Sequence, residues 1–214
     1  MKLRLHNYWR SSASHRVRIG LNLKQLAYEY VVVNIVKSDQ HADLYRAKNP
    51  MGQVPTLEIV EADGSLRSIS QSLPILEYLE ERFPAIALLP SDLYLRARTR
   101  SLAEIINSGI QPLQNLTTTN QVQAIGGDVP AWTRRFIADG LAAFERSVAE
   151  VAGTFCVGDA PTLADCCLIP QLASARRFAV ELTRHPRLLE IEARCLALPA
   201  FADAMPDRQP DAVT

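Results

Sequence analysis

The chain has 214 residues, of which 48% are hydrophobic and 21% are charged, a balance typical of a globular protein with a sizeable core. Its 23 basic residues equal its 23 acidic residues, which excludes proteins that bind polyanions through bulk positive charge. The first residues lack the apolar segment of a signal peptide, and no apolar run is long enough for a membrane span. We therefore expect a cytoplasmic protein with neither nucleic-acid nor membrane partners.

The cysteines and histidines show no metal-ligand spacing. No two cysteines form a Cys-x-x-Cys motif, and the adjacent Cys166 and Cys167 fall within one predicted helix. We expect the cysteines to be small buried residues in a reducing compartment. The sequence therefore predicts neither a metal site nor a disulfide framework.

The first 84 residues alternate strand-like and helical patterns. Strand-like runs cover residues 3–8, 28–36, 54–60 and 66–70, and a turn sequence, Ala62-Asp63-Gly64, separates the last two. Helical patterns cover Ser12–Leu23, residues 41–48 and residues 73–83. The order βαβαββα predicts an α/β domain over residues 1–84, with a mixed sheet covered by helices.

The rest of the chain has helical periodicity only. Residues 85–91 contain a proline-bounded break and are expected to link the first domain to an all-helical domain at 92–214. A long helical segment at 92–119 contains Gly109 and Pro112, which predict a bend. Further helices are predicted at 132–151, 163–178 and 186–198. The helix predicted at 163–178 begins with the Thr-x-x-Asp pattern of a capping box.

The junction between the first strand and the first helix is the strongest candidate for a binding site. A helix N-terminus carries unpaired N–H groups and partial positive charge, so it stabilises an anion. Hydroxyl groups and positive charges gather around it: Ser11, Ser12, Ser14, Arg10, Arg16 and Arg18. Because serines are also ordinary N-cap residues, the pattern fits a simple cap, a thiolate site or a carboxylate site.

Three other segments have features typical of ligand binding. A cis bond between Val54 and Pro55 would let the Val54 backbone pair with a peptide-like ligand, whereas a trans bond would only mark a strand edge. Residues 70–72, Ser-Gln-Ser, begin a predicted helix and form a second anion-binding terminus. Arg176 and Arg177 lie late in a helix, where arginines also commonly complement the helix dipole.

In combination, these motifs resemble the glutathione transferases, and residues 8–19 and 109–116 resemble the zeta class of that family. Residues 49–55, 161–165 and 208–211 add to the resemblance, which covers essentially the whole chain. It implies a thioredoxin-like α/β N-terminal domain, an all-α C-terminal domain and a homodimer. In one departure, Ala13 stands where the family usually has cysteine, so chemistry by a protein thiol at that position is not implied.

The resemblance implies glutathione as the cofactor and gives each candidate residue a role. Ser11, supported by Ser12, would hydrogen-bond the glutathione sulfur and favour its thiolate. The tripeptide would be held by Gln40 and His41 at its glycine end, Val54 at its cysteinyl backbone, Gln71 and Ser72 at its γ-glutamyl group, and Gln111 and Asn115 from the helical domain or a partner subunit. Arg10 and Arg177 would neutralise the carboxylates of a small dicarboxylate substrate.

The activity best known for this family is maleylacetoacetate isomerase, which acts in tyrosine and aromatic amino acid catabolism. Reversible thiolate addition to a conjugated double bond would allow rotation and return the thiol unchanged. Maleylpyruvate isomerase is an alternative, although that branch looks more basic at the positions of residues 116–118, Leu-Thr-Thr. A transferase or dehalogenase acting on α-haloacids is a second alternative, and a non-catalytic assembly module is a third. The combined presence of Ser11, Gln71 and both arginines argues against the last.

Overall fold

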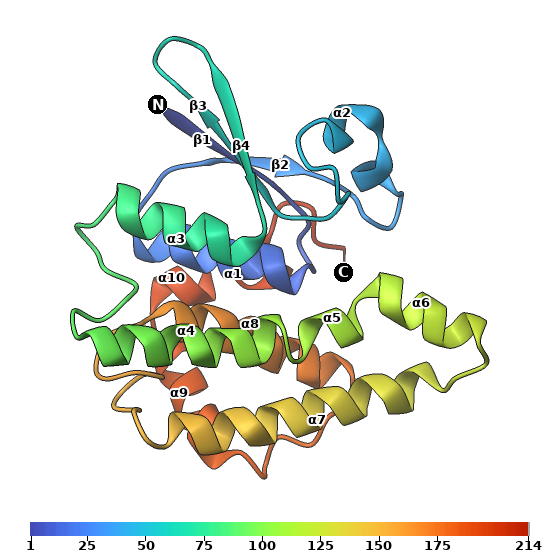
Figure 1. The fold of residues 1–214 in the computed structure, drawn as a ribbon, viewed down its shortest axis with the longest axis vertical. Helices are drawn as coiled ribbons and strands as arrows, with labels where there is room; N and C mark the ends of the chain where they lie inside the picture. Colours follow the sequence, from blue (N-terminus) through green and yellow to red (C-terminus); the bar gives the residue numbers. More distant parts are fainter. Residues whose placement is uncertain (214) are drawn as a thin grey trace. The chain divides into compact units, whose positions relative to one another are not determined.

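A computed structural model describes residues 1–213, which form two compact units (Figure 1). Unit 1 contains Met1–Ala87 together with the C-terminal segment that begins at Leu198. Unit 2 contains Leu88–Ala197. The division departs from the expected boundaries, because the C-terminal segment folds with the N-terminal domain and not with the helical one.

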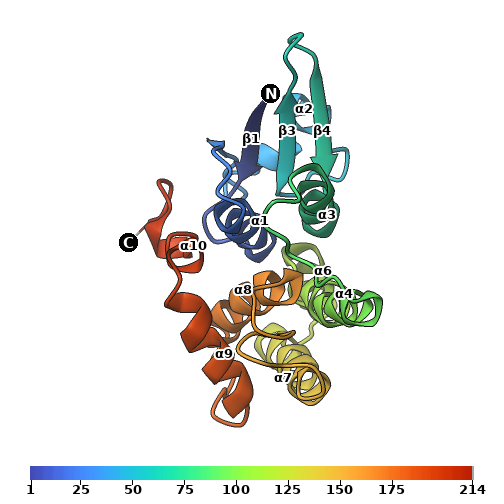
Figure 2. The ribbon, with the colours of Figure 1, turned by 90° about the vertical axis from the view of Figure 1, so that its left-hand side faces the viewer.

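Unit 1 is built on a four-stranded sheet of order β2-β1-β3-β4. Its strands are β1 (Lys2–Asn7), β2 (Glu29–Val32), β3 (Thr56–Val60) and β4 (Leu66–Ser70). β1 pairs parallel with β2 and antiparallel with β3, and β3 and β4 form the antiparallel hairpin. Helices α1 (Ser12–Leu23) and α3 (Ser72–Arg82) lie side by side on one face of this sheet (Figure 2). The predicted thioredoxin-like order is therefore confirmed.

The connection from β2 to β3 carries the short helices η1 (Asp39–His41) and α2 (Asp43–Arg46). β2 is shorter than the predicted strand at residues 28–36. It stops because the Asn34 side-chain carbonyl accepts hydrogen bonds from the backbone N–H groups of Val36 and Lys37. An asparagine that bonds the following backbone in this way makes a turn that competes with the sheet.

Unit 2 is helical. Its helices are α4 (Leu93–Asn107), α5 (Gln111–Gln114), α6 (Leu116–Ala124), α7 (Val129–Val148), α8 (Leu163–Arg177) and α9 (Pro186–Leu196). α4 packs against both α7 and α8, with fully buried Leu102, Leu141 and Leu168 in the core. The predicted capping box of α8 is present, since Thr162 and Asp165 bond each other's backbone.

The single bent helix predicted for residues 92–119 is wrong, because this region forms three helices. α4 ends before Gly109, and Pro112 stands in the first turn of α5, where its missing N–H costs nothing. Asn115 then caps α6 with its side chain. The predicted linker also differs, because Leu88 and Leu89 are only 1% and 3% exposed and pack within unit 2.

The C-terminal segment contains α10 (Pro199–Ala202) and η2 (Pro206–Arg208), and α10 packs against α1. The Asn22 side chain of α1 donates to the Ala200 carbonyl at 3.0 Å. The buried Arg18 guanidinium donates to the Ala204 carbonyl at 3.0 Å. These bonds explain why a tail that reads as polar in sequence belongs to unit 1.

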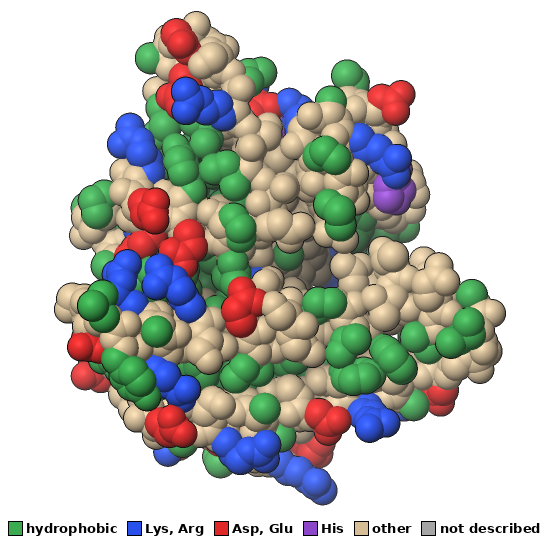
Figure 3. Space-filling view, viewed as in Figure 1, with side chains coloured by type: hydrophobic (Ala, Val, Ile, Leu, Met, Phe, Trp, Pro, Cys, Tyr) green, Lys and Arg blue, Asp and Glu red, His purple; other side chains and the backbone are tan. Residues whose placement is uncertain are grey.

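The four cysteines are free and buried. Over residues 1–213, no three histidine, cysteine, aspartate or glutamate side chains gather as a metal site would require. None of the helices described combines the length and apolar character needed to cross a bilayer. Acidic and basic side chains are interspersed over the face drawn in Figure 3, consistent with the balanced charge of the chain.

Candidate functional site

The strand–helix junction is organised by Ser11, the N-cap of α1. Its Oγ accepts a hydrogen bond of 3.2 Å from the Ser14 N–H, and its carbonyl accepts one of 2.8 Å from the His15 N–H. The cap expected from sequence is therefore present. A hydroxyl that accepts a bond still has its own proton to donate, so capping leaves Ser11 able to bind an anion. Ser11 and Ser12 are both half-buried.

The three arginines of this junction occupy different environments. Arg10 is exposed, and its guanidinium lies 5.4 Å from the centre of the Trp9 ring. Arg16 and Arg18 are fully buried. Arg16 donates from Nη1 to the Ser72 hydroxyl at 2.8 Å, whereas Arg18 donates to the Asn7 side chain and to backbone carbonyls. Arg10 is thus the one of the three that faces solvent, whereas Arg16 and Arg18 donate hydrogen bonds to groups inside unit 1.

His15 is also buried in α1. Burial, with the nearby positive charge of Arg18, holds the pKa of the His15 imidazole well below its ordinary value. Desolvation penalises the charged form of an imidazole, so His15 is neutral near pH 7. The positive charge close to the junction therefore comes from the arginines and from the α1 terminus.

A second helix N-terminus is formed by Gln71 and Ser72. Gln71 has φ +69°, uncommon for a non-glycine residue, and its exposed side chain does not cap α3. Ser72 begins α3 and is almost fully buried, with its Oγ accepting from Arg16. The helix terminus, the Ser72 hydroxyl proton and the underlying guanidinium all favour a carboxylate at this position.

The Val54–Pro55 peptide bond is cis, which settles the alternative that the sequence left open. The preceding carbonyl, that of Gln53, is held by two side chains. Tyr45 donates to it through its hydroxyl at 2.6 Å, and Asn49 donates through its amide at 2.7 Å. Sequence reasoning missed these two positioning residues, because Tyr45 lies in a different element, α2, and its partner cannot be read from spacing.

Gln40 and His41 lie in η1, where their side chains contact each other and that of His41 also contacts Arg46. The Arg46 guanidinium lies 3.3 Å from His41 Nδ1. The Gln40 side-chain nitrogen, Nε2, lies 3.2 Å from His41 Nε2. These contacts join Gln40 to His41, and His41 to Arg46 of α2.

Gly52 allows η1 to approach the loop that precedes Val54. A Cβ at position 52 would lie 3.0 Å from both the Gln40 carbonyl oxygen and His41 Nδ1, and the residue has φ +59°. Only glycine accommodates this contact without strain. Two contacts therefore link the elements of unit 1 that carry candidate residues. Arg16 and Ser72 join α1 to α3, and Gly52 lets η1 pack against the Val54 loop.

Unit 2 holds the other candidates. Gln111 is the first residue of α5, and Asn115 is the N-cap of α6, where its side chain accepts from the Thr117 N–H. The fully buried Gln171 of α8 accepts from the Gln111 amide at 3.3 Å. It also exchanges hydrogen bonds with Gln114. Gln171 thus orients Gln111, a role that its position in an apolar helix did not reveal.

The two arginines at the end of α8 are both exposed, and Arg176 makes an ion pair within unit 2. Arg176 directs both terminal nitrogens at Glu192, a bidentate ion pair with a buried carboxylate that raises the pKa of Arg176. Arg177 is exposed, with its guanidinium 4.6 Å from the centre of the Phe178 ring. The Arg176 guanidinium is thus engaged by Glu192, and binding of an external carboxylate by Arg177 stays a prediction.

Comparison with known proteins gives consistent matches. Residues 10–82 match the family model described as glutathione S-transferase, N-terminal domain. A glutathione S-transferase zeta class protein from Euphorbia esula is 45% identical and is matched over 100% of this chain and 94% of its own length. A maleylpyruvate isomerase from Ralstonia sp is 41% identical, over 98% of this chain and 99% of that protein.

A solved structure gives a similar result. The maleylacetoacetate isomerase of Anaeromyxobacter dehalogenans 2CP-1, with bound glutathione in its active site, superimposes with a TM-score of 0.92 at 52% identity. The match covers 99% of this chain and 98% of that one. The same protein has also been crystallised with dicarboxyethyl glutathione and citrate in the active site.

Proposed function

This chain belongs to the zeta class of the glutathione transferase family, and from that premise we propose that it is a glutathione-dependent cis–trans isomerase of maleylacetoacetate. The observation that carries the proposal is Ser11, whose hydroxyl caps α1 and still has a proton for an anion. The similar Anaeromyxobacter enzyme binds glutathione, and this supports glutathione as the cofactor here.

The residues of unit 1 fit an anionic tripeptide. A buried guanidinium beneath Ser72 and the terminus of α3 supply positive potential for the γ-glutamyl carboxylate, with Gln71 alongside. The Val54 loop, held through the Gln53 carbonyl, offers extended backbone to the cysteinyl part. Gln40 and His41 are proposed to bind the glycine end, and Gln111 and Asn115 to reach the tripeptide from unit 2 or from a partner subunit.

Bound glutathione would supply a thiolate that adds reversibly to a double bond conjugated with carbonyl groups, so that rotation about that bond becomes possible. The task of Ser11 is to keep this sulfur charged near pH 7. A free thiol has a pKa of about 8.5, and one pKa unit corresponds to about 1.4 kcal/mol. A hydrogen bond to a charged group is worth about 1.5–3 kcal/mol, and a helix terminus adds about 0.3–1 kcal/mol. Together these contributions would lower the thiol pKa by about 1.3–3 units, to about 7 or below, and Ser12 would add to them.

Arg10 and Arg177 are proposed to bind the substrate carboxylates. Both side chains are exposed, and each guanidinium lies over the aromatic ring of a neighbouring residue, which limits its freedom. A planar guanidinium matches a carboxylate with two parallel hydrogen bonds, so a pair of them selects a diacid. The dicarboxyethyl glutathione bound by the Anaeromyxobacter relative supports a site of this kind.

We propose further that the enzyme is a cytoplasmic homodimer that acts in tyrosine and aromatic amino acid catabolism. The free, buried cysteines support a reducing compartment. The dimer and the pathway rest on family membership. A single species with the monomer mass of 23.7 kDa in light scattering at micromolar concentration would contradict the dimer.

Maleylpyruvate isomerisation is a second candidate, favoured by the match to the Ralstonia enzyme over nearly the whole chain. Both candidates use the same chemistry, and they differ in the length of the diacid. The test is to supply each diacid with and without glutathione and to follow product and thiol together. We expect faster turnover of maleylacetoacetate, dependent on glutathione, with no thiol consumed. Stoichiometric loss of thiol would instead indicate conjugation or dehalogenation, and turnover without glutathione would contradict the proposal.

A further inference from the structure

We propose that Asp211, in the C-terminal segment, is a positioning residue for the junction that carries Arg10 and Ser11. The carboxylate of Asp211 accepts a hydrogen bond of 3.1 Å from the Trp9 backbone N–H. Its other oxygen accepts one from the Tyr30 hydroxyl of β2. The two bonded residues lie far apart in sequence, since Asp211 follows Trp9 by 202 positions. The inference rests on the proposed function for its catalytic consequence.

The Trp9 peptide unit lies in the turn that leads into the site. The Ser11 N–H donates to the Tyr8 carbonyl at 3.1 Å, so residues 8–11 form a β-turn with Trp9 and Arg10 at its centre. In such a turn the N–H of the first central residue has no partner within the turn. Asp211 provides that partner from outside, and the two residues whose side chains bind ligand in our proposal follow directly.

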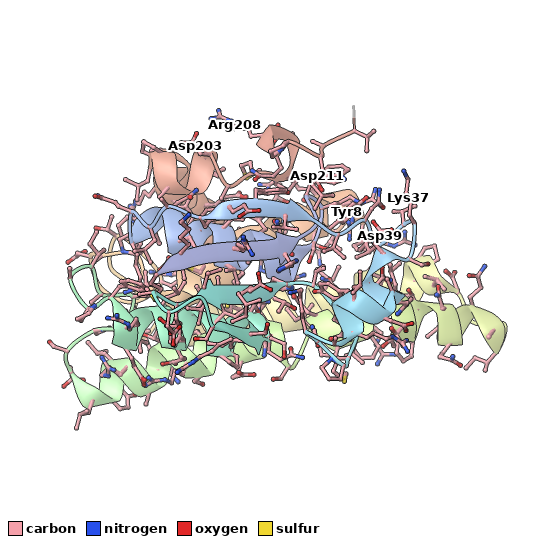
Figure 4. All side chains as sticks on the ribbon, turned by 90° about the horizontal axis from the view of Figure 1, so that it is seen from above. Tyr8, Lys37, Asp39, Asp203, Arg208 and Asp211 are labelled. Carbon is pink, nitrogen blue, oxygen red and sulfur yellow. The ribbon has the colours of Figure 1, made fainter. Side chains whose placement is uncertain are left out.

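The opposite side of the same residue is also held by the C-terminal segment. The Trp9 carbonyl accepts from Arg18 Nη2 at 3.0 Å, and the same nitrogen donates to the Ala204 carbonyl at 3.0 Å. Arg18 therefore links the turn to Ala204 of the segment, and Asp211 links the turn to a position nearer the C-terminus. Figure 4 shows Asp211 near Tyr8, with Asp203 and Arg208 elsewhere on the segment.

The segment is itself fixed in shape, so it can serve as a support. The buried Gln209 side chain donates to the carbonyls of Asp203 and Met205 at 2.8 Å and 2.7 Å. Pro210 restricts the backbone immediately before Asp211. A short polar stretch, residues 208–211, is thus folded so that one carboxylate meets the turn. Positioning of the Trp9 turn therefore gives residues 208–211 a role, whereas the ligand contacts proposed for other residues give them none.

Activity measurements on Asp211 variants test the proposal. Losing the contact to Trp9 should displace Ser11, so Asp211→Ala should lower kcat about tenfold, as small displacements in active sites commonly do. The acid limb of the pH–rate profile should move to higher pH, while KM for glutathione changes by less than about threefold, because other residues bind the tripeptide. Asp211→Asn keeps one acceptor for the Trp9 N–H and should recover part of kcat.

Two further variants separate positioning from stability. Asp203→Asn makes the same charge change in the same segment, but its carboxylate only pairs with the exposed Arg208, so kcat should stay at the wild-type value. Tyr30→Phe removes the other bond to Asp211 and leaves the contact to Trp9, so its kcat should exceed that of Asp211→Ala. If Asp211→Ala does not fold, kcat is compared among Asp211→Asn, Tyr30→Phe and Asp203→Asn instead.

A second readout does not depend on the reaction. The chain has two tryptophans, so in a Trp132→Phe background the fluorescence of Trp9 reports on the turn alone. Acrylamide quenching of Trp9 should increase in Asp211→Ala and not in Asp203→Asn. If the wild type isomerises neither diacid, the proposed function fails, and quenching still decides whether Asp211 fixes the turn. A folded Asp211→Ala variant with unchanged quenching, or with an unchanged kcat and pH profile, would overturn the inference.

Discussion

Arg16 and Ser72 are joined by a hydrogen bond of 2.8 Å in which the guanidinium donates to the hydroxyl. Both residues are buried, and they belong to the two helices whose N-termini form the candidate site of unit 1. One cation therefore ties α1 to α3 and lies beneath the position proposed for the γ-glutamyl carboxylate. We therefore expect the buried Arg16 to contribute both to the packing of unit 1 and to its affinity for glutathione.

We predict that Arg16→Lys raises KM for glutathione about tenfold, because lysine keeps the charge but loses the rigid fork that reaches Ser72. kcat should fall less, since Ser11 is unaffected. Arg67→Lys, at an exposed position of β4, is the matched control and should leave both constants unchanged. Steady-state kinetics with varied glutathione measure the effect, and an unaltered KM in a folded Arg16→Lys protein would refute it.

The arginines at the end of α8 give a prediction about the substrate. Arg177→Ala should raise KM for the diacid by about tenfold to a hundredfold, as expected for loss of a charge-assisted pair, with little effect on KM for glutathione. Arg10→Ala should act in the same direction. Arg176→Ala is the comparison, because Arg176 pairs with Glu192 and its loss should lower Tm without a selective effect on the diacid. Equal effects of Arg176→Ala and Arg177→Ala on diacid KM would contradict this assignment.

Much of unit 1 could be predicted from sequence because its signals are local. The helix Ser12–Leu23 and the strand Leu66–Ser70 were predicted with the bounds observed, one from its serine start and the other from the turn before it. The predictions are wrong where a side chain decides where a strand ends, or where a distant segment decides which unit part of the chain joins. β2 is cut short by Asn34, and the C-terminal segment joins unit 1 through Arg18, a contact between residues far apart in the chain.

The candidate site shows the same distinction. Ser11, Gln71 and Ser72 stand at helix starts, which sequence reveals directly, and their roles as ligand contacts stay predictions. Tyr45, Asn49 and Gln171, which orient candidate residues through hydrogen bonds between elements, left no spacing pattern to find. Sequence also could not distinguish the buried Arg16 from the exposed Arg10, because tertiary packing alone determines which arginine is covered.

The pH dependence of stability offers a test of the buried His15. Its pKa in the folded protein lies well below the unfolded value of about 6.5, so the unfolded chain binds a proton first as pH falls. The contribution of His15 to stability is therefore complete above pH 6.5 and declines below it. Between pH 7.5 and 5.5, wild type should lose about 1 kcal/mol more unfolding free energy than His15→Gln does. Urea denaturation at both pH values measures this, and parallel losses in the two proteins would show that His15 is not the cause.

The most direct test of the central claim is the pH dependence of kcat/KM in wild type, Ser11→Ala and Ser12→Ala, measured with glutathione and maleylacetoacetate. If the Ser11 hydroxyl stabilises the bound thiolate, Ser11→Ala should lower kcat/KM at pH 7 about tenfold to a hundredfold and shift the acid limb up by about one pH unit or more. Its loss as a helix cap should cost only about 1 kcal/mol of stability, so the variant stays folded. Ser12→Ala should show a smaller shift. An acid limb and kcat/KM equal to those of wild type in folded Ser11→Ala would contradict the account.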